Sequence, residues 1–180
     1  FYSNTTGGGN VAVGVSALTA NTTASDNVAV GHGALAANTT GAENVAVGQG
    51  ALDANTTASS NTAVGRMALS ANTTGANNTG LGHQALILVT TGGGNTAVGK
   101  NALAATCADS NTAVGSSAGT AVTGSSNTLI GEAAGVAVTS GGNNLLLGAN
   151  AGRSGGPGGN ITTHSNRLGL GDENISEANI

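Results

Sequence analysis

The sequence predicts an all-β repeat solenoid of the left-handed parallel β-roll or β-helix type, with coils of about 17 residues. A short block, Asn-x-x-aliphatic-Gly, restarts every 16 or 17 residues, the residues around it have strand spacing, and no stretch has the period of an amphipathic helix. The block begins at Asn10, Asn27, Asn44, Asn61, Asn78, Asn95, Asn111, Asn127 and Asn144.

One complete unit runs from Asn44 to Ser60, and we number its positions 1 to 17. Position 1 is always Asn, position 4 is always Val, Leu or Ile, and position 5 is always Gly. Position 2 is Val or Thr until Leu145, and position 3 is nearly always Ala. Since β-branched residues favour strands and Gly favours turns, each unit begins with a short strand that ends in a Gly turn. The residues expected to form structural ladders between units are Asn27, Asn44, Asn61, Asn78, Gly31, Gly48, Gly65, Gly82, Val30, Val47 and Val64.

Each class of ladder residue has a physical reason to recur. A Gly kept at one place in every unit indicates a left-handed backbone or a close approach of two chain segments, where a Cβ would clash. Stacked Asn side chains can hydrogen-bond to each other as an amide ladder. After the strand, each unit continues with Ala-Leu and a return loop rich in Thr, Ser, Gly and Asn.

The apolar content of one unit indicates that one chain does not suffice. The larger apolar groups are Val at position 4 and Leu at position 9, and full burial of each contributes only ~1.5–3 kcal/mol. Ordering each backbone residue costs on the order of 1–2 kcal/mol. Because Val at positions 2 and 4 and Ala at position 3 make both strand faces apolar, we expect one face to fill the coil and the other to meet a partner surface, which the small Ala and Gly can approach closely. We therefore expect an intertwined or side-by-side homotrimer.

Composition excludes several classes of partner. The chain has 180 residues, a net charge of −4, one Phe, one Tyr and no Trp. Its four basic residues are scattered and have no aromatic neighbours, which argues against nucleic-acid binding and against insertion into or binding to an anionic membrane. Cys107 stands alone, and we interpret it as an incidental small residue.

The repeat divides the chain into two segments. Residues 1–152 form the repeat shaft or head, and residues 153–180 are expected to be a cap or a junction to another module. The second segment contains the only Pro and five of the twelve charged residues. A solenoid needs a polar cap or a transition at its end, which this change of composition would supply.

No catalytic, cofactor-binding or metal-binding constellation is found in the sequence, which predicts a non-enzymatic protein without a cofactor. His32 and His83 share position 6, but the other units place unrelated residues there, so we interpret this file as an exposed outer row. The carboxylates Asp26, Glu43, Asp53, Asp109 and Glu132 fall in different coils and form no Asp-x-Asp calcium loop. Each Gly-Gly-Gly precedes a strand and not a helix, unlike a phosphate-binding loop.

Two features of the return loop are candidate surface contacts. Thr-Thr pairs recur in successive units and predict either a turn ladder or a flat array that binds ice or crystalline polysaccharide. The Asn before each pair, for example Asn21, is a formal Asn-x-Thr glycan acceptor. An apolar run replaces the usual polar residues in one unit, either as a core plug or as an exposed patch. The candidate contact residues are Thr22, Thr23, Thr39, Thr40, Thr56, Thr57, Ile87, Leu88 and Val89.

The block Asn-x-Ala-Val-Gly, followed by Ala-Leu and Asn-Thr-Thr-Gly, resembles two groups of fibre repeats over residues 4–152. One is the β-roll head repeat of trimeric autotransporter adhesins; the other is the Asn-Thr-Ala-Val-Gly repeat of phage tail fibres and bacterial surface fibres. The present unit is longer than the adhesin repeat, so its return loop must bulge or add a third side. The resemblance implies a homotrimeric extracellular fibre, on a virion tail or a cell surface, whose partner is a cell-surface receptor or a glycan.

Three functions follow from these expectations. The first is a structural and adhesive fibre segment that mediates attachment. The second is a self-assembling extracellular filament or spacer, and the third is a Thr-rich solenoid that binds ice or polysaccharide.

Overall fold

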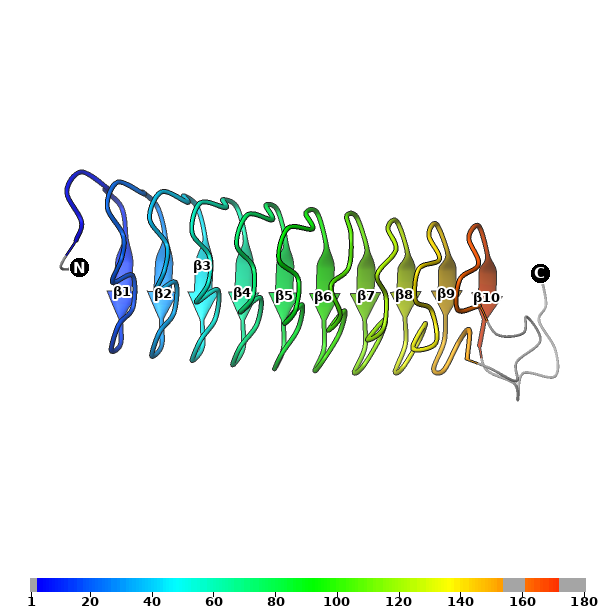
Figure 1. Ribbon diagram of the computed structural model, residues 1–180. Coiled ribbons are helices and arrows are strands. Elements are labelled where there is room, and N and C mark those ends of the chain that lie inside the picture. Colours follow the sequence, from blue (N-terminus) through cyan, green and yellow to red (C-terminus); the bar gives the residue numbers. More distant parts are fainter. Residues whose placement is uncertain (1–2, 154–160, 172–180) are drawn as a thin grey trace.

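The computed structural model describes residues 3–153 and 161–171, which form ten short parallel strands in a single sheet and contain no helix (Figure 1). The strands follow one another in chain order, one strand per coil. The predicted all-β solenoid with coils of about 17 residues is therefore confirmed. The strands are β1 (Val11–Val13), β2 (Val28–Val30), β3 (Val45–Val47), β4 (Thr62–Val64), β5 (Thr79–Leu81), β6 (Thr96–Val98), β7 (Thr112–Val114), β8 (Thr128–Ile130), β9 (Leu145–Leu147) and β10 (Leu168–Leu170).

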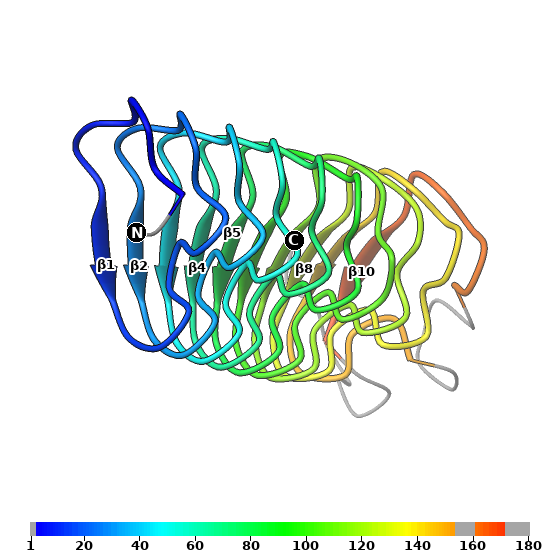
Figure 2. The same ribbon diagram turned by 60° about the vertical axis from the view of Figure 1, so that its left-hand side comes forward.

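Equivalent positions of successive coils lie directly beside each other. Val30 pairs with Val47, and Val47 pairs with Val64, in a parallel ladder. Figure 2 shows that each coil closes as a loop on one side of the sheet, which gives an elongated stack. The loops are also hydrogen-bonded from coil to coil, for example from Leu35 N to Ala51 O at 3.0 Å. Every side of the coil therefore repeats the same bonds along the axis.

The core is built mainly from Ala at positions 3 and 8 and Leu at position 9. Six of these leucines are fully buried and have φ between 48° and 55°. A bulky residue with positive φ is uncommon, because its Cβ crowds the backbone. The stack holds this conformation because it points each Leu into the interior, where burial offsets the strain. The six are Leu18, Leu35, Leu52, Leu69, Leu86 and Leu103.

The structure decides which strand face fills the coil, a choice that the sequence left open. Ala29, Ala46 and Ala63 are fully buried, whereas Val47 and Val64 point away from the coil. The interior already holds Leu from position 9 and Asn from position 1, so only a small side chain fits at position 3. The aliphatic face of the strand is the one left without a covering surface.

Late coils use the same interior volume in a different way. Position 3 becomes Leu in β8 and β9, as Leu129 and Leu146, and position 9 becomes Gly. A Cβ on Gly135 would lie 2.7 Å from Leu129 Cδ2, so the two positions share one space. In the coil of β7, position 3 is Ala113 and position 9 is already Gly119, and a Cβ on Gly119 would lie 2.7 Å from Leu129 Cδ1 of the next coil. A Leu from position 3 therefore fills the space that the missing Leu at position 9 leaves.

The sheet continues into the segment that we expected to be a cap. β10 pairs with β9, with Leu168 beside Leu145, so residues 161–171 belong to the solenoid. Arg167 takes the place of the first Asn of the block, and its backbone N donates to Asn144 Oδ1 at 3.0 Å. The file of Asn residues ends there. Residues 154–160, which include the Pro, and residues 172–180 lie outside the described residues.

Candidate functional site

The Asn residues at position 1 form a buried amide ladder. Asn44 Oδ1 accepts hydrogen bonds from the backbone N of Asn61 at 3.0 Å and from its Nδ2 at 3.2 Å. Asn44 Nδ2 also donates to Ala58 O at 2.9 Å, which ties the strand to the return loop. The side chains of Asn27, Asn44, Asn61 and Asn78 are fully buried. The ladder therefore fixes both the spacing of the coils and the closure of each coil.

A second Asn ladder runs along position 12. Asn55 Nδ2 donates to Asn38 Oδ1, and Asn72 Nδ2 donates to Asn55 Oδ1, each at 2.9 Å. The ladder stops where Val89 occupies the position, and Asn72 Oδ1 is left buried without a partner. Because these side chains point inward, a glycan on Asn38, Asn55, Asn72 or the equivalent Asn21 is incompatible with the folded coil.

The Gly residues at position 5 stack backbone on backbone. Gly31, Gly48, Gly65 and Gly82 have φ between 134° and 139°. A Cβ on any of them would lie 2.5–2.6 Å from the carbonyl oxygen of the next Gly in the file. Both the conformation and the approach of the neighbouring coil therefore require Gly at this corner.

Positions 2 and 4 of β1–β10 form what we call the outer sheet face. It presents twenty side chains, of which fifteen are Val, Leu or Ile, five are Thr and none is charged. In the single chain these groups are partly open to solvent: Val64 is 39% exposed and Ile130 is 41% exposed. A long, regular, uncharged face of this kind is typical of an interaction surface.

The two residues of each Thr pair have different environments. The first hydroxyl of each pair donates to the next coil, as from Thr22 Oγ1 to Thr39 O at 3.1 Å and from Thr39 Oγ1 to Thr56 O at 3.0 Å. The second residues, Thr23, Thr40 and Thr57, are exposed at the corner. The turn-ladder hypothesis thus describes the first Thr, and only the second presents an exposed hydroxyl.

The apolar run is divided in the same way. Val89 is fully buried and belongs to the core, Ile87 is half-buried, and Leu88 is 52% exposed. The plug hypothesis holds for Val89. Leu88 supplies a single exposed apolar group, too little for a contact patch by itself.

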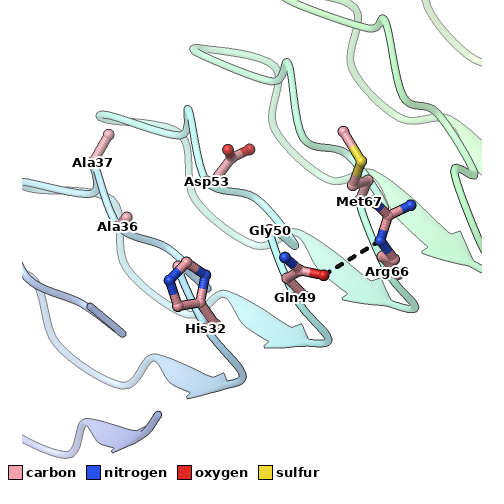
Figure 3. A pocket seen from close by; sticks show the side chains of 9 residues that line it. His32, Ala36, Ala37, Gln49, Gly50, Asp53, Arg66 and Met67 are labelled. Carbon is pink, nitrogen blue, oxygen red and sulfur yellow. Dashed lines mark hydrogen bonds between the residues drawn. The ribbon is translucent and has the colours of Figure 1, made fainter. Parts of the chain in front are cut away.

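A shallow groove crosses the coils of β2–β4 on a different wall (Figure 3). Its volume is about 490 Å³. His32, Gln49 and Arg66 come from position 6 of three successive coils, and Asp53 lines the same groove from position 10. Partial burial raises the pKa of the Asp53 carboxyl. The remaining lining residues are Gly33, Ala36, Ala37, Gly50 and Met67.

Other kinds of site are not found among the described residues. No three His, Cys, Asp or Glu side chains of that part of the chain lie close enough together to hold a metal ion. Nor does it contain a helix that is long and apolar enough to cross a membrane. Comparisons of the chain with protein-family models, with curated proteins and with solved structures found no match.

Cys107 lies in the core, and burial, followed by the nearby charge of Asp109, raises the pKa of its thiol to about 12. Since the thiolate is the nucleophile, we expect no labelling by iodoacetamide at pH 8 in the folded protein and complete labelling in denaturant. Mass spectrometry of the intact chain measures the difference. Rapid labelling without denaturant would show that this part of the return loop opens.

Proposed function

We propose that this chain is a structural segment of a homotrimeric extracellular fibre that attaches to a cell or a surface, as part of a virion tail or of a cell surface. The observation that carries the proposal is the outer sheet face, an unbroken double file of aliphatic side chains and Thr along the whole stack. The two Asn ladders and the Gly file support a rod-like role, because they repeat the same bonds in coil after coil.

A second copy of the chain is the partner that fits this face best. Ten strands spaced ~4.8 Å apart give the face a length of about 43 Å. Another copy has the same spacing, so its aliphatic side chains can interdigitate with these along the full length. The face supplies twenty side chains, and a standard interface uses roughly 20–30 residues on each side.

The number of three chains and the extracellular location rest on the resemblance of the repeat to trimeric fibres. Three chains around an axis parallel to the stack would close all three outer sheet faces at once. Closure matters because an open arrangement of identical apolar faces would grow without limit.

A charge on the outer sheet face tests the proposal. We expect the wild-type chain to have three times its monomer mass in light scattering, and the double variant Val64→Lys, Val98→Lys to have the monomer mass. Both positions point away from the coil, so each Lys reaches water in a single chain and the coil keeps its far-ultraviolet circular dichroism.

Thr57→Lys is the matched control, because Thr57 is exposed at a corner away from this face. It should leave the mass unchanged. A monomeric wild-type chain would overturn the proposal, since the aliphatic files would then face water in solution. A mass that increases steadily with concentration would favour the filament or spacer, and thermal hysteresis would favour the ice-binding solenoid.

A further inference from the structure

We propose that the groove over β2–β4 binds an acidic sugar of a surface polysaccharide. This inference deepens the proposed function, on which it rests, by assigning the attachment chemistry to a wall of the coil other than the outer sheet face. The lining residues come from positions 6, 7, 10 and 11, so association through positions 2 and 4 leaves the groove open.

Basic and amide side chains gather in one file next to the groove. Position 6 holds His32, Gln49, Arg66, His83 and Lys100 in five successive coils. This file contains two of the four Lys and Arg residues and two of the three His residues of the whole chain. The basic residues that look scattered in the sequence are thus partly brought together by the stacking of coils.

Arg66 is placed by side chains of the two neighbouring coils. Its Nε donates to Gln49 Oε1 at 3.3 Å, and its Nη1 lies 3.2 Å from His83 Nε2 (Figure 3 shows the first bond). A guanidinium group has only donors, so His83 Nε2 is the acceptor in this contact, and His83 Nδ1 is buried without a hydrogen-bond partner. Neither partner carries a charge that neutralises Arg66. The guanidinium is therefore oriented and keeps Nη2 for a ligand carboxylate.

Asp53 requires a different chemical group. It lines the groove together with the position 6 side chains and, when ionised, only accepts hydrogen bonds. A simple anion such as inorganic sulfate would bring negative charge to Asp53 and offer it no donor. A sugar acid offers a carboxylate to Arg66 and hydroxyl donors to Asp53, while Gln49 Nε2 remains available to hydroxyl oxygens.

Small residues leave room in the groove for a ring. Gly33 and Gly50 line it, and a Cβ on Gly33 would meet no atom within 4 Å. Met67 supplies an apolar surface for the C–H groups of a sugar. Lys100 lies two coils beyond Arg66, ~9.6 Å along the stack, a distance comparable with the length of a disaccharide. A polysaccharide that runs along the stack can therefore place a second acidic group beside Lys100, and several chains in one fibre add avidity.

Titration of the full chain with D-glucuronate, followed by nuclear magnetic resonance, tests the inference. We expect saturable shifts at His32, Gln49 and Gly50, weaker binding of D-glucose, and weaker binding of inorganic sulfate. Arg66→Gln should weaken glucuronate binding about tenfold, because it removes a charge-assisted hydrogen bond. Asp53→Asn should weaken glucuronate binding as well, and a simple anion site would instead bind more tightly without this carboxylate.

Arg153→Gln is the control, because Arg153 is an exposed arginine that bonds to Asn150 and lies outside the groove. It should leave binding unchanged. The inference is overturned by an absence of saturable shifts at tens of millimolar glucuronate, by equal binding of glucose or sulfate, or by an Arg66→Gln variant that binds as the wild type does. Light scattering on the same samples separates the two proposals: a trimer that binds no sugar rejects only this inference, and a monomer that binds glucuronate rejects only the fibre.

Discussion

Gly65→Ala is expected to destabilise the stack by about 3–5 kcal/mol, because the new methyl group combines an unfavourable backbone conformation with a steric clash. The residue has φ +134°, and the new Cβ would lie 2.5 Å from Gly82 O and 2.6 Å from Gly82 C. Both contacts are backbone atoms of the next coil, which cannot rotate away as a side chain does. The coil must move away from its neighbour, and this movement lengthens the bond from Gly82 N to Val64 O.

The matched control is Gly33→Ala, two positions along the unit from the Gly file. Gly33 also has positive φ, +70°, but no atom lies within 4 Å of the Cβ position. Its substitution should cost only about 1–2 kcal/mol, the cost of a left-handed conformation for an L-residue. Urea denaturation followed by circular dichroism compares the two variants. Equal losses would mean that φ, and not the approach of the next coil, makes Gly necessary at position 5.

The Gly and Asn files could be predicted because a constraint that acts in every coil leaves the same residue in every unit. Comparing the units of one chain therefore reveals the constraint, and no homologous sequences are needed. The direction of the strand could not be predicted in this way. Val-Ala-Val alternates whether Val or Ala faces inward, and the choice depends on Leu69 and its equivalents, which enter from another wall. That geometry follows from the shape of the closed coil.

The inward direction of the Asn at position 12 had a signal that the sequence interpretation missed. Val89, Val122, Val138 and Ile161 replace this Asn in later coils and are all buried. A polar residue that alternates with aliphatic residues at one position is more consistent with a bonded interior group than with an exposed acceptor. The Asn-x-Thr pattern suggested an exposed Asn only because the pattern covers three residues and does not compare one unit with the next.

Part of the groove could also be predicted from the sequence, and part could not. Stacking of position 6 was visible in the sequence, because the unit length brings His32, Gln49 and Arg66 into one file. The position of Asp53 in the groove depends on how the chain turns after β3, where Gly50 and Leu52 have positive φ. The periodicity of a sequence does not give the turn angles of a coil. Only the structure therefore showed that Asp53 lines the same groove as the position 6 side chains.

Asn61→Ser is expected to cost about 2–4 kcal/mol, because Asn61 lies in the middle of the first amide ladder. Asn61 Oδ1 accepts from Asn78 N at 2.9 Å, and its Nδ2 donates to Asn44 Oδ1 at 3.2 Å. The Ser hydroxyl is too short to make both bonds, so the buried N–H of Asn78 loses its acceptor. In a repeat stack, loss of one junction also weakens the coupling between the two halves, so we expect a broader unfolding transition.

Asn77→Ser makes the same chemical change at an exposed position and serves as its control. Ser60 occupies the equivalent place in the preceding unit with the same φ of 60°, so Ser is accommodated there without strain. This variant should remain within about 0.5 kcal/mol of the wild type. Hydrogen exchange gives a local measurement: the Asn78 amide should exchange faster in Asn61→Ser and at the wild-type rate in Asn77→Ser. If the Asn78 amide stays protected in both variants, the Asn ladder is a consequence of the stacking of the coils and does not stabilise it.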